Sequence, residues 1–157
     1  MRNVRSAAAI VLLIVLDALL KRQVRLSLGD HVLRWDGVFA LRYVRNTGAA
    51  FSLFSAHTTL LSVFTGLLLL AGLAVLFSGK VRHLLLRAAL VMILAGGAGN
   101  WIDRVRFGFV TDYIEPLFMR FAVFNFADIL ITVGAGLLIV WMIMDAVRDR
   151  RTKRSAP

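Results

Sequence analysis

The sequence predicts an all-α membrane protein: a bundle of four transmembrane helices with a small β-sheet-containing extracytoplasmic segment between the first and second helices. Hydrophobic residues make up 59% of the chain, whereas soluble domains contain roughly 45–50%. Four apolar runs each approach the ~20 residues that a helix needs to cross the hydrocarbon core. Only helices and closed barrels satisfy the backbone in lipid, and continuous apolar runs are not the alternating pattern of barrel strands.

The four apolar runs belong to a single integral membrane domain, 1–157. The approximate spans are 6–20, 58–77, 84–102 and 123–144. The first run follows a basic start, as in a secretory signal, but no small-residue cleavage pattern follows it, so we interpret it as a retained span. The basic tail, 145–157, is expected to be cytoplasmic and disordered.

Basic residues predict the orientation of the helices. Lys and Arg are denser at the N-terminus, between the second and third spans and in the tail than in the other two connections. Cytoplasmic connections carry such an excess, so we expect both termini in the cytoplasm. The net charge of +10 is therefore attributed to helix anchoring, and no nucleic-acid partner is expected.

The segment 21–57, between the first two spans, is too long for a plain turn. Val32–Trp35 and Val38–Val44 are β-prone and partly alternating, and Asp36-Gly37 between them is a hairpin signal. We expect a small sheet on the outer membrane surface.

Polar and ionisable residues gather between 96 and 128, where they are costly near a bilayer and indicate function. Asp112 follows the third span and Asp128 lies near the start of the fourth, so both carboxylates could reach one depth. Two carboxylates within a few ångströms cannot both ionise easily, so one keeps its proton while the other accepts a proton from water. Such a pair could hydrolyse a peptide bond without a metal.

Several nearby polar residues also have simpler interpretations. Asp17 and Lys21 have the i,i+4 spacing of a helical ion pair. Asn46 with Gly48 is typical of a turn, and Asn125 could cap the fourth helix.

One face of the third span is also polar. Gly96, Asn100 and Arg104 recur every four residues and therefore lie on one side of a helix. Asp103 adjoins Arg104 and lies near Arg106, so a local ion pair or a helix-end role is expected for it.

Three alternatives to an aspartic peptidase remain. Ser52 and Lys21 could form a serine–lysine hydrolase, although nothing in the sequence brings them together. Asp17, Asp112 and Asp128 could act as relays in a small transporter or proton channel, but the centres of the second and third spans carry no charge. A non-catalytic scaffold is the third alternative. Cysteine is absent and the histidines lack ligand spacing, so no metal or cofactor is expected.

Together the motifs resemble those of the lipoprotein signal peptidase family, also called signal peptidase II. They are, in the family's order, Asp17 with Lys21, then 46–52, 96–104, 110–113 and 124–128. The resemblance implies an intramembrane aspartic endopeptidase of the bacterial cytoplasmic (inner) membrane, sensitive to globomycin, with its active site near the outer leaflet. Its implied partners are membrane lipids and diacylglyceryl-modified prolipoproteins, which it cleaves before the lipid-modified cysteine. We expect a monomer.

Carried over position by position, the resemblance implies that Asp112 and Asp128 are the catalytic dyad that activates water. The residues that it implies bind substrate or shape the site are Asn46, Gly48, Ala50, Gly96, Asn100, Arg104, Val110, Phe124, Asn125, Ala127, Asp17 and Lys21. The chain departs from the family pattern in two places. The glycine motif before Asn100 lacks a bulky apolar residue that the family often has, and Tyr113 replaces the more usual Phe. Neither departure removes a catalytic group.

Overall fold

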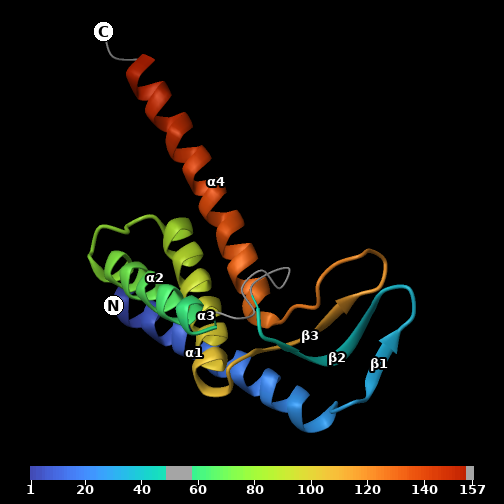
Figure 1. Cartoon of the computed structure of the whole chain (residues 1–157). Coiled ribbons are helices and arrows are strands. Elements are labelled where there is room, and N and C mark those ends of the chain that lie inside the picture. Colours follow the sequence, from blue (N-terminus) through green and yellow to red (C-terminus); the bar gives the residue numbers. More distant parts are fainter. Residues whose placement is uncertain (49–57, 155–157) are drawn as a thin grey trace.

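The computed structural model describes residues 1–48 and 58–154. All four of its helices are long and apolar enough to cross a membrane, and a three-stranded sheet accompanies them, which confirms the predicted fold class (Figure 1). In chain order the elements are α1 (Arg2–Ser27), β1 (Val32–Trp35), β2 (Phe39–Asn46), α2 (Thr58–Phe77), α3 (Leu84–Phe107), β3 (Val110–Pro116) and α4 (Phe126–Arg154).

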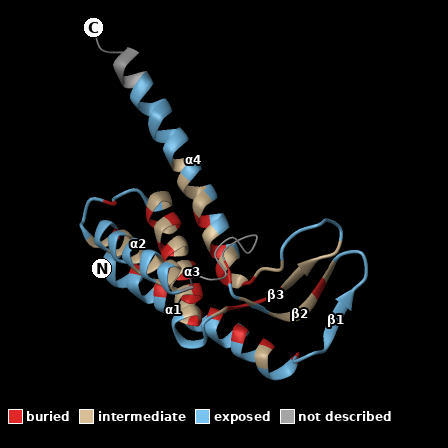
Figure 2. Ribbon diagram, in the orientation of Figure 1, coloured by how far each residue is buried: buried red, intermediate tan, exposed pale blue. Residues whose placement is uncertain are grey.

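Helix α3 is the centre of the bundle and packs against α1, α2 and α4. Buried residues concentrate along α3 and where the helices meet the sheet, whereas much of α1, α2 and α4 is exposed (Figure 2). The exposed side chains include many Leu, Val and Ile residues, as expected for surfaces that face lipid. The main core cluster consists of Ile10, Leu76, Val91, Leu94, Ala95 and Leu130.

Helices α1 and α3 run in the same direction. At one end Arg87 Nη1 donates a hydrogen bond of 3.0 Å to Ser6 Oγ, and at the other Lys21 Nζ donates one of 2.8 Å to Asn100 Oδ1. A rise of 1.5 Å per residue puts these two contacts about 20 Å apart. The bundle therefore has two polar ends separated by an apolar middle.

The sheet confirms the predicted hairpin and adds a strand. Strands β1 and β2 pair antiparallel with Trp35 opposite Phe39, and the turn between them contains Gly37 at φ 75°. Strand β3 pairs antiparallel with β2 and places Asn46 opposite Val110. The sequence predicted no strand around Asp112 after the third span, so the third strand is a correction to that prediction.

Three helices extend beyond the apolar runs that predicted them. Helix α1 continues to Ser27, so the first part of the segment predicted to be β-rich is helical. There Val24 and Leu28 pack against Tyr113, because the helix leaves the bundle and covers the sheet. Helix α3 ends only at Phe107, and α4 begins at 126 and continues through most of the basic tail to 154, so this tail is not disordered up to that point.

Candidate active site

The start of α4 is closed by a reciprocal pair of hydrogen bonds. Asn125 precedes the helix, and its Oδ1 accepts a hydrogen bond of 3.1 Å from the backbone N–H of Asp128. In return Asp128 Oδ2 accepts one of 3.0 Å from the backbone N–H of Asn125. This is a capping box, in which the residue before the helix and the third helical residue satisfy each other's free amides. The predicted capping role of Asn125 is confirmed.

The two amides between Asn125 and Asp128 are satisfied from other elements. The N–H of Phe126 donates a 3.3 Å hydrogen bond to the Tyr113 hydroxyl on β3. The N–H of Ala127 donates a 3.1 Å hydrogen bond to Asp17 Oδ1 on α1. Unpaired amides at a buried helix start are costly, so these contacts fix α4 relative to α1 and the sheet. The hydroxyl that distinguishes Tyr113 from Phe is thus used by the fold.

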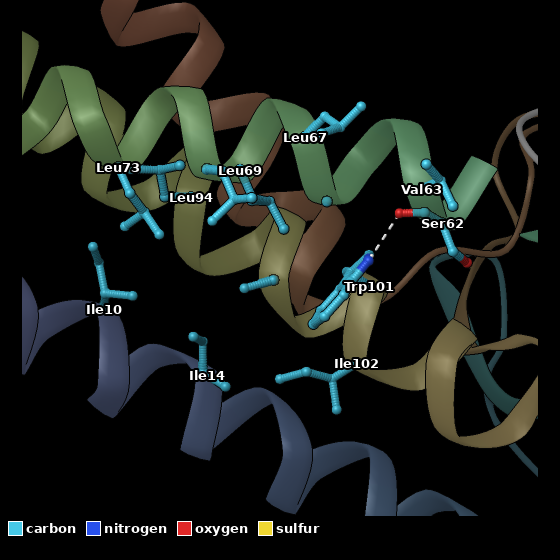
Figure 3. Close-up of a pocket in the computed structure, with 13 residues that line it drawn as sticks. Ile10, Ile14, Ser62, Val63, Leu67, Leu69, Leu73, Leu94, Trp101 and Ile102 are labelled. Carbon is cyan, nitrogen blue, oxygen red and sulfur yellow. Dashed lines mark hydrogen bonds between the residues drawn. The ribbon is translucent and has the colours of Figure 1, made fainter. Parts of the chain in front are cut away.

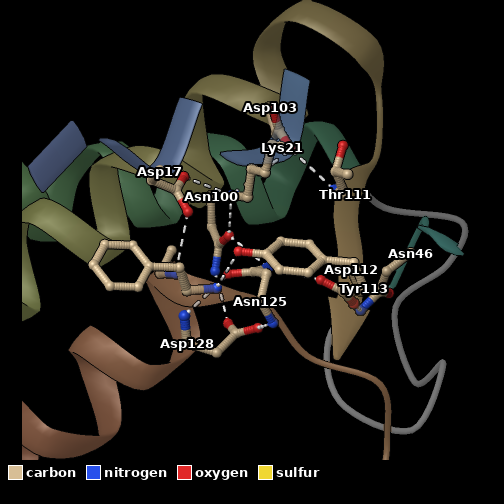
Figure 4. Close-up of polar contacts among 12 residues, drawn as sticks. Asp17, Lys21, Asn46, Asn100, Asp103, Thr111, Asp112, Tyr113, Asn125 and Asp128 are labelled. Carbon is tan, nitrogen blue, oxygen red and sulfur yellow. Dashed lines mark hydrogen bonds and ion pairs between the residues drawn. The ribbon is translucent and has the colours of Figure 1, made fainter. Parts of the chain in front are cut away.

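The Asn125 side chain also reaches the second aspartate. Its Nδ2 donates a 2.7 Å hydrogen bond to Asp112 Oδ1 and a 3.1 Å one to Asn100 Oδ1. Figure 4 shows Asn125 between the carboxylates of Asp112 and Asp128. One residue therefore donates to both carboxylates, to that of Asp112 from its side-chain amide and to that of Asp128 from its backbone N–H.

Strand pairing places the carboxylate of Asp112. The register of β2 and β3 sets Val44 opposite Asp112, and Asn46 Nδ2 donates a 2.8 Å hydrogen bond to Asp112 Oδ2. Asn46 Oδ1 accepts from the N–H of Gly48 at 3.0 Å, which confirms the predicted turn. Asp112 is only 2% exposed, and this burial raises the pKa of its carboxyl to about 6, against the opposing effect of the two asparagine hydrogen bonds.

Asp128 is connected to a buried ion pair through the side chain of Asn100. Asn100 Nδ2 donates a 2.8 Å hydrogen bond to Asp128 Oδ1, and Lys21 Nζ donates one of 2.8 Å to Asn100 Oδ1. Lys21 Nζ also lies 2.8 Å from Asp17 Oδ2, with both side chains 1% exposed, which confirms the predicted i,i+4 pair. Asn100 is thereby held in the orientation that presents its amide hydrogens to Asp128.

Small residues let the helices approach closely enough for these contacts. A Cβ added to Gly96 would meet the Ala127 carbonyl oxygen and lie 3.1 Å from Leu130 Cβ. A Cβ added to Gly99 would meet the Asp17 carboxylate. Gly96 therefore sets the distance between α3 and α4, and Gly99, in the same glycine motif, sets that between α3 and α1.

Asp103 forms contacts that its sequence neighbours did not predict. Its carboxylate lies 3.7 Å from Lys21 Nζ and 3.6 Å from Arg25 Nη1, so its ionic partners are on α1 rather than at Arg104 or Arg106. Its Oδ2 also accepts a 2.9 Å hydrogen bond from the N–H of Thr111. Arg25 is a residue that sequence reasoning missed, although its i,i+4 spacing from Lys21 places both cations on one helix face.

Both aspartates line one pocket of about 460 Å³. Arg104, Asn46 and Gly48 line it with them, and the rest of the lining is mainly apolar: Phe121, Ala122, Val123, Phe124, Ile129, Thr132 and Val133. A polar end and an apolar wall thus share one cavity. Of the other expected site residues, Val110 and Ala127 are buried, and Ala50 lies outside the described residues.

A second pocket of about 470 Å³ lies among α1, α2 and α3 (Figure 3). Its described lining holds no titratable side chain, being formed largely by residues such as Ile10, Ile14 and Leu73. At its rim Trp101 Nε1 donates a 2.9 Å hydrogen bond to the Ser62 carbonyl oxygen. Of these two pockets, the one that contains the aspartates is the one with ionisable side chains in its described lining.

Known proteins resemble this chain in sequence and in fold. A family model described as signal peptidase (SPase) II matches residues 9–144. The lipoprotein signal peptidase of Streptococcus thermophilus is 40% identical over 142 residues, 89% of this chain and 93% of that protein. That of Lactococcus lactis subsp. cremoris is 39% identical over 147 residues, 92% of this chain and 97% of that protein.

A solved structure of a bacterial membrane enzyme has a TM-score of 0.80 to this chain at 30% identity, covering 90% of this chain and 89% of the other. A second solved bacterial membrane enzyme has a TM-score of 0.79 at 28% identity. The chain belongs to the signal peptidase II family, and its four apolar helices make it a multi-pass bacterial membrane protein.

Proposed function

We propose that this chain is an aspartic endopeptidase that removes signal peptides from diacylglyceryl-modified prolipoproteins by cleaving before the lipid-modified cysteine. The observation that carries the proposal is the double contact of Asn125, which donates to Asp112 from its side chain and to Asp128 from its backbone. Both carboxylates open into the same pocket. The similar proteins named lipoprotein signal peptidase supply the substrate class.

The two aspartates would divide the roles of acid and base. With its pKa raised to about 6, Asp112 keeps its proton to a higher pH than an ordinary aspartate does, and in its protonated form it can donate a hydrogen bond to the scissile carbonyl oxygen. Asp128, in the first turn of α4, accepts hydrogen bonds from the Asn100 side-chain amide and the Asn125 backbone N–H, and a helix start stabilises negative charge. Asp128 would take a proton from water as the water oxygen attacks the carbonyl carbon. The C–N bond then breaks, and the amine of the cysteine leaves with a proton from the dyad.

The lining of the pocket suits a substrate that is part peptide and part lipid. Arg104 lies beside both aspartates, and its guanidinium could hydrogen-bond carbonyl groups of the substrate backbone. Ile129 and Val133 continue the pocket along α4, where acyl chains or apolar signal-peptide residues would lie. Binding energy from these remote parts would position the scissile bond.

The proposed orientation places both termini in the cytoplasm and the aspartates near the outer leaflet. Arg2, Arg5 and Arg82 lie at the end of the bundle opposite the aspartates, and positive charge favours the cytoplasmic side. A monomer would suffice, because one chain supplies both carboxylates.

A proton relay is the main competing function, and the apolar middle of the bundle argues against it. Ser6 and Arg87 lie at one end and the aspartate network at the other, with Ile10 and Leu94 in the core between them. No titratable residue occurs at 7–16 or 88–99, so a relay along α1 and α3 would lack carriers. The serine–lysine alternative depends on Ser52, which lies outside the described residues.

The proposal is tested by cleavage of a purified preprotein with and without its diacylglyceryl group. The wild type in lipid nanodiscs should cut only the lipidated form, and mass spectrometry should place the cut directly before the modified cysteine. Asp128→Asn should abolish cleavage, whereas Asp36→Asn, at a side chain 92% exposed, should not change it. Equal cutting of both substrates would refute the substrate class, and full activity of Asp128→Asn would refute the dyad.

A further inference from the structure

A pocket of about 400 Å³ lies at the end of the bundle opposite the aspartates, between the first turns of α1 and α3. Four arginines line it: Arg2, Arg5, Arg82 and Arg87. No acidic residue is found in its described lining. The rest of its lining is Ser6 and the apolar residues Ala9, Leu84, Ala88 and Val91. The proposed peptidase chemistry uses none of these residues.

Arg87 is a buried cation whose hydrogen-bond partners among the described residues are all neutral. It is 7% exposed, and its guanidinium donates to Asn3 Oδ1 at 3.1 Å, Ser6 Oγ at 3.0 Å and the Val81 carbonyl oxygen at 2.8 Å. Its Nε is buried and has no hydrogen-bond partner among the described residues. Within the described part of the chain, no carboxylate forms an ion pair with it. A buried charge without a counter-charge is costly, so the site favours an anion.

The start of α3 adds to the positive potential of the same pocket. His83 occupies the position before this helix and makes no side-chain hydrogen bond to its free amides. Leu84, the first residue of the helix, lines the pocket. The partial positive charge of a helix start attracts anions such as phosphate. The positive charges of the buried guanidinium, the exposed arginines and the helix start therefore all face one cavity.

We propose that this pocket binds the phosphate of an anionic phospholipid. Basic pockets between transmembrane helices bind anionic lipid headgroups, and the arginine fork suits phosphate oxygens. A lipid rather than a free phosphate fits because Ala9, Ala88 and Val91 continue the pocket along the apolar faces of α1 and α3. Acyl chains attached to a phosphate in the pocket would therefore lie along the membrane-spanning part of both helices.

The test measures lipid affinity directly. The delipidated full chain in detergent is titrated with phosphatidylglycerol or phosphatidylcholine of identical acyl chains, and bound lipid is counted by native mass spectrometry. The wild type should prefer phosphatidylglycerol. Because one surface arginine is worth about fivefold in affinity for anionic lipid, Arg2→Gln and Arg82→Gln should each weaken phosphatidylglycerol binding by about that factor. Both side chains are exposed, so these changes leave the core intact.

Arg34→Gln is the matched control, because Arg34 lies on the hairpin, where it pairs with Asp36 at 3.6 Å and is 62% exposed. This variant should bind phosphatidylglycerol like the wild type. Equal affinity for the two lipids, or equal losses in Arg34→Gln and Arg82→Gln, would overturn the proposal. Displacement of phosphatidylglycerol by an equimolar amount of inorganic phosphate would overturn the assignment of a lipid as the ligand.

Discussion

The Asn125 side chain donates a 2.7 Å hydrogen bond from its Nδ2 to Asp112, while its Oδ1 caps α4, the helix that carries Asp128. One residue therefore links the start of α4 to both carboxylates. This link makes it possible to separate the contribution of Asn125 to folding from its contribution to activity.

Two substitutions at Asn125 should have different effects. Asn125→Ser keeps an oxygen that can cap α4 but loses the amide that reaches Asp112, so it should lose only the stability from that amide's hydrogen bonds, and cleavage should fall by about 100-fold. Asn125→Ala loses the cap as well and should lower the free energy of unfolding by about 1 kcal/mol more. Thermal unfolding and cleavage rates in the same detergent measure both effects. A serine variant as active as the wild type would show that the contact with Asp112 is dispensable.

The pH dependence of cleavage should reflect the titration of Asp112. The proposed mechanism needs its protonated form, and its pKa is raised to about 6, so kcat/KM should fall as pH rises through that value. The amide of Asn46 stabilises the charged form. Asn46→Ala should therefore raise the pKa and move the fall to higher pH. Tyr43→Phe, which loses only a hydroxyl that accepts from Arg45, should leave the profile unchanged. A downward shift in Asn46→Ala would contradict this assignment.

The buried pair of Lys21 and Asp17 should be sensitive to the loss of one partner. Lys21→Met leaves the Asp17 carboxylate without its cation and should cost about 3–5 kcal/mol. Adding Asp17→Asn removes the unpaired charge yet keeps an oxygen that can accept from the Ala127 N–H, so the double variant should recover much of the loss. The free energies of unfolding of the wild type and the two variants are compared by chemical denaturation. No recovery in the double variant would mean that the cation acts mainly through Asn100.

Glycine substitutions should separate close packing from helix propensity. Gly96→Ala would place a methyl group against the Ala127 carbonyl oxygen, so α3 and α4 must move apart and the melting temperature should fall together with activity. Gly136→Ala adds the same group on α4 where nothing lies within 4 Å, and should leave both unchanged or raise stability slightly. Similar effects of the two changes would refute a packing role for Gly96.

The sequence was sufficient for features that depend on local pattern. Apolar runs of span length predicted the helices, and Asp36-Gly37 predicted the hairpin, because each signal lies within the element that it specifies. Family motifs named residues that do meet in space, such as Asn46 with Asp112 and Asn100 with Asp128. A motif predicts which residues belong to a site, but not which hydrogen bonds they form.

The features that the sequence analysis missed depend on distant partners. Strand β3 forms because it pairs with β2, which lies far away in the chain and is separated from it by two helices. Helix α1 continues past its apolar run because Val24 and Leu28 pack on the sheet rather than against lipid. Asp103 finds its cations on α1 for the same reason. Hydropathy predicts which segments contact lipid. It does not predict these contacts, because they are formed between groups of the protein itself.

The most direct measurement of the central claim is the single-turnover rate constant for cleavage of a lipidated preprotein by the wild type, Asp112→Asn and Asp128→Asn. Substrate affinity and melting temperature are measured on the same samples. If the two carboxylates perform the chemistry, each isosteric change should lower the rate constant at saturating substrate by at least about 100-fold, with affinity and folding retained. A rate constant within a few-fold of the wild type in either variant would contradict the Asp112–Asp128 dyad.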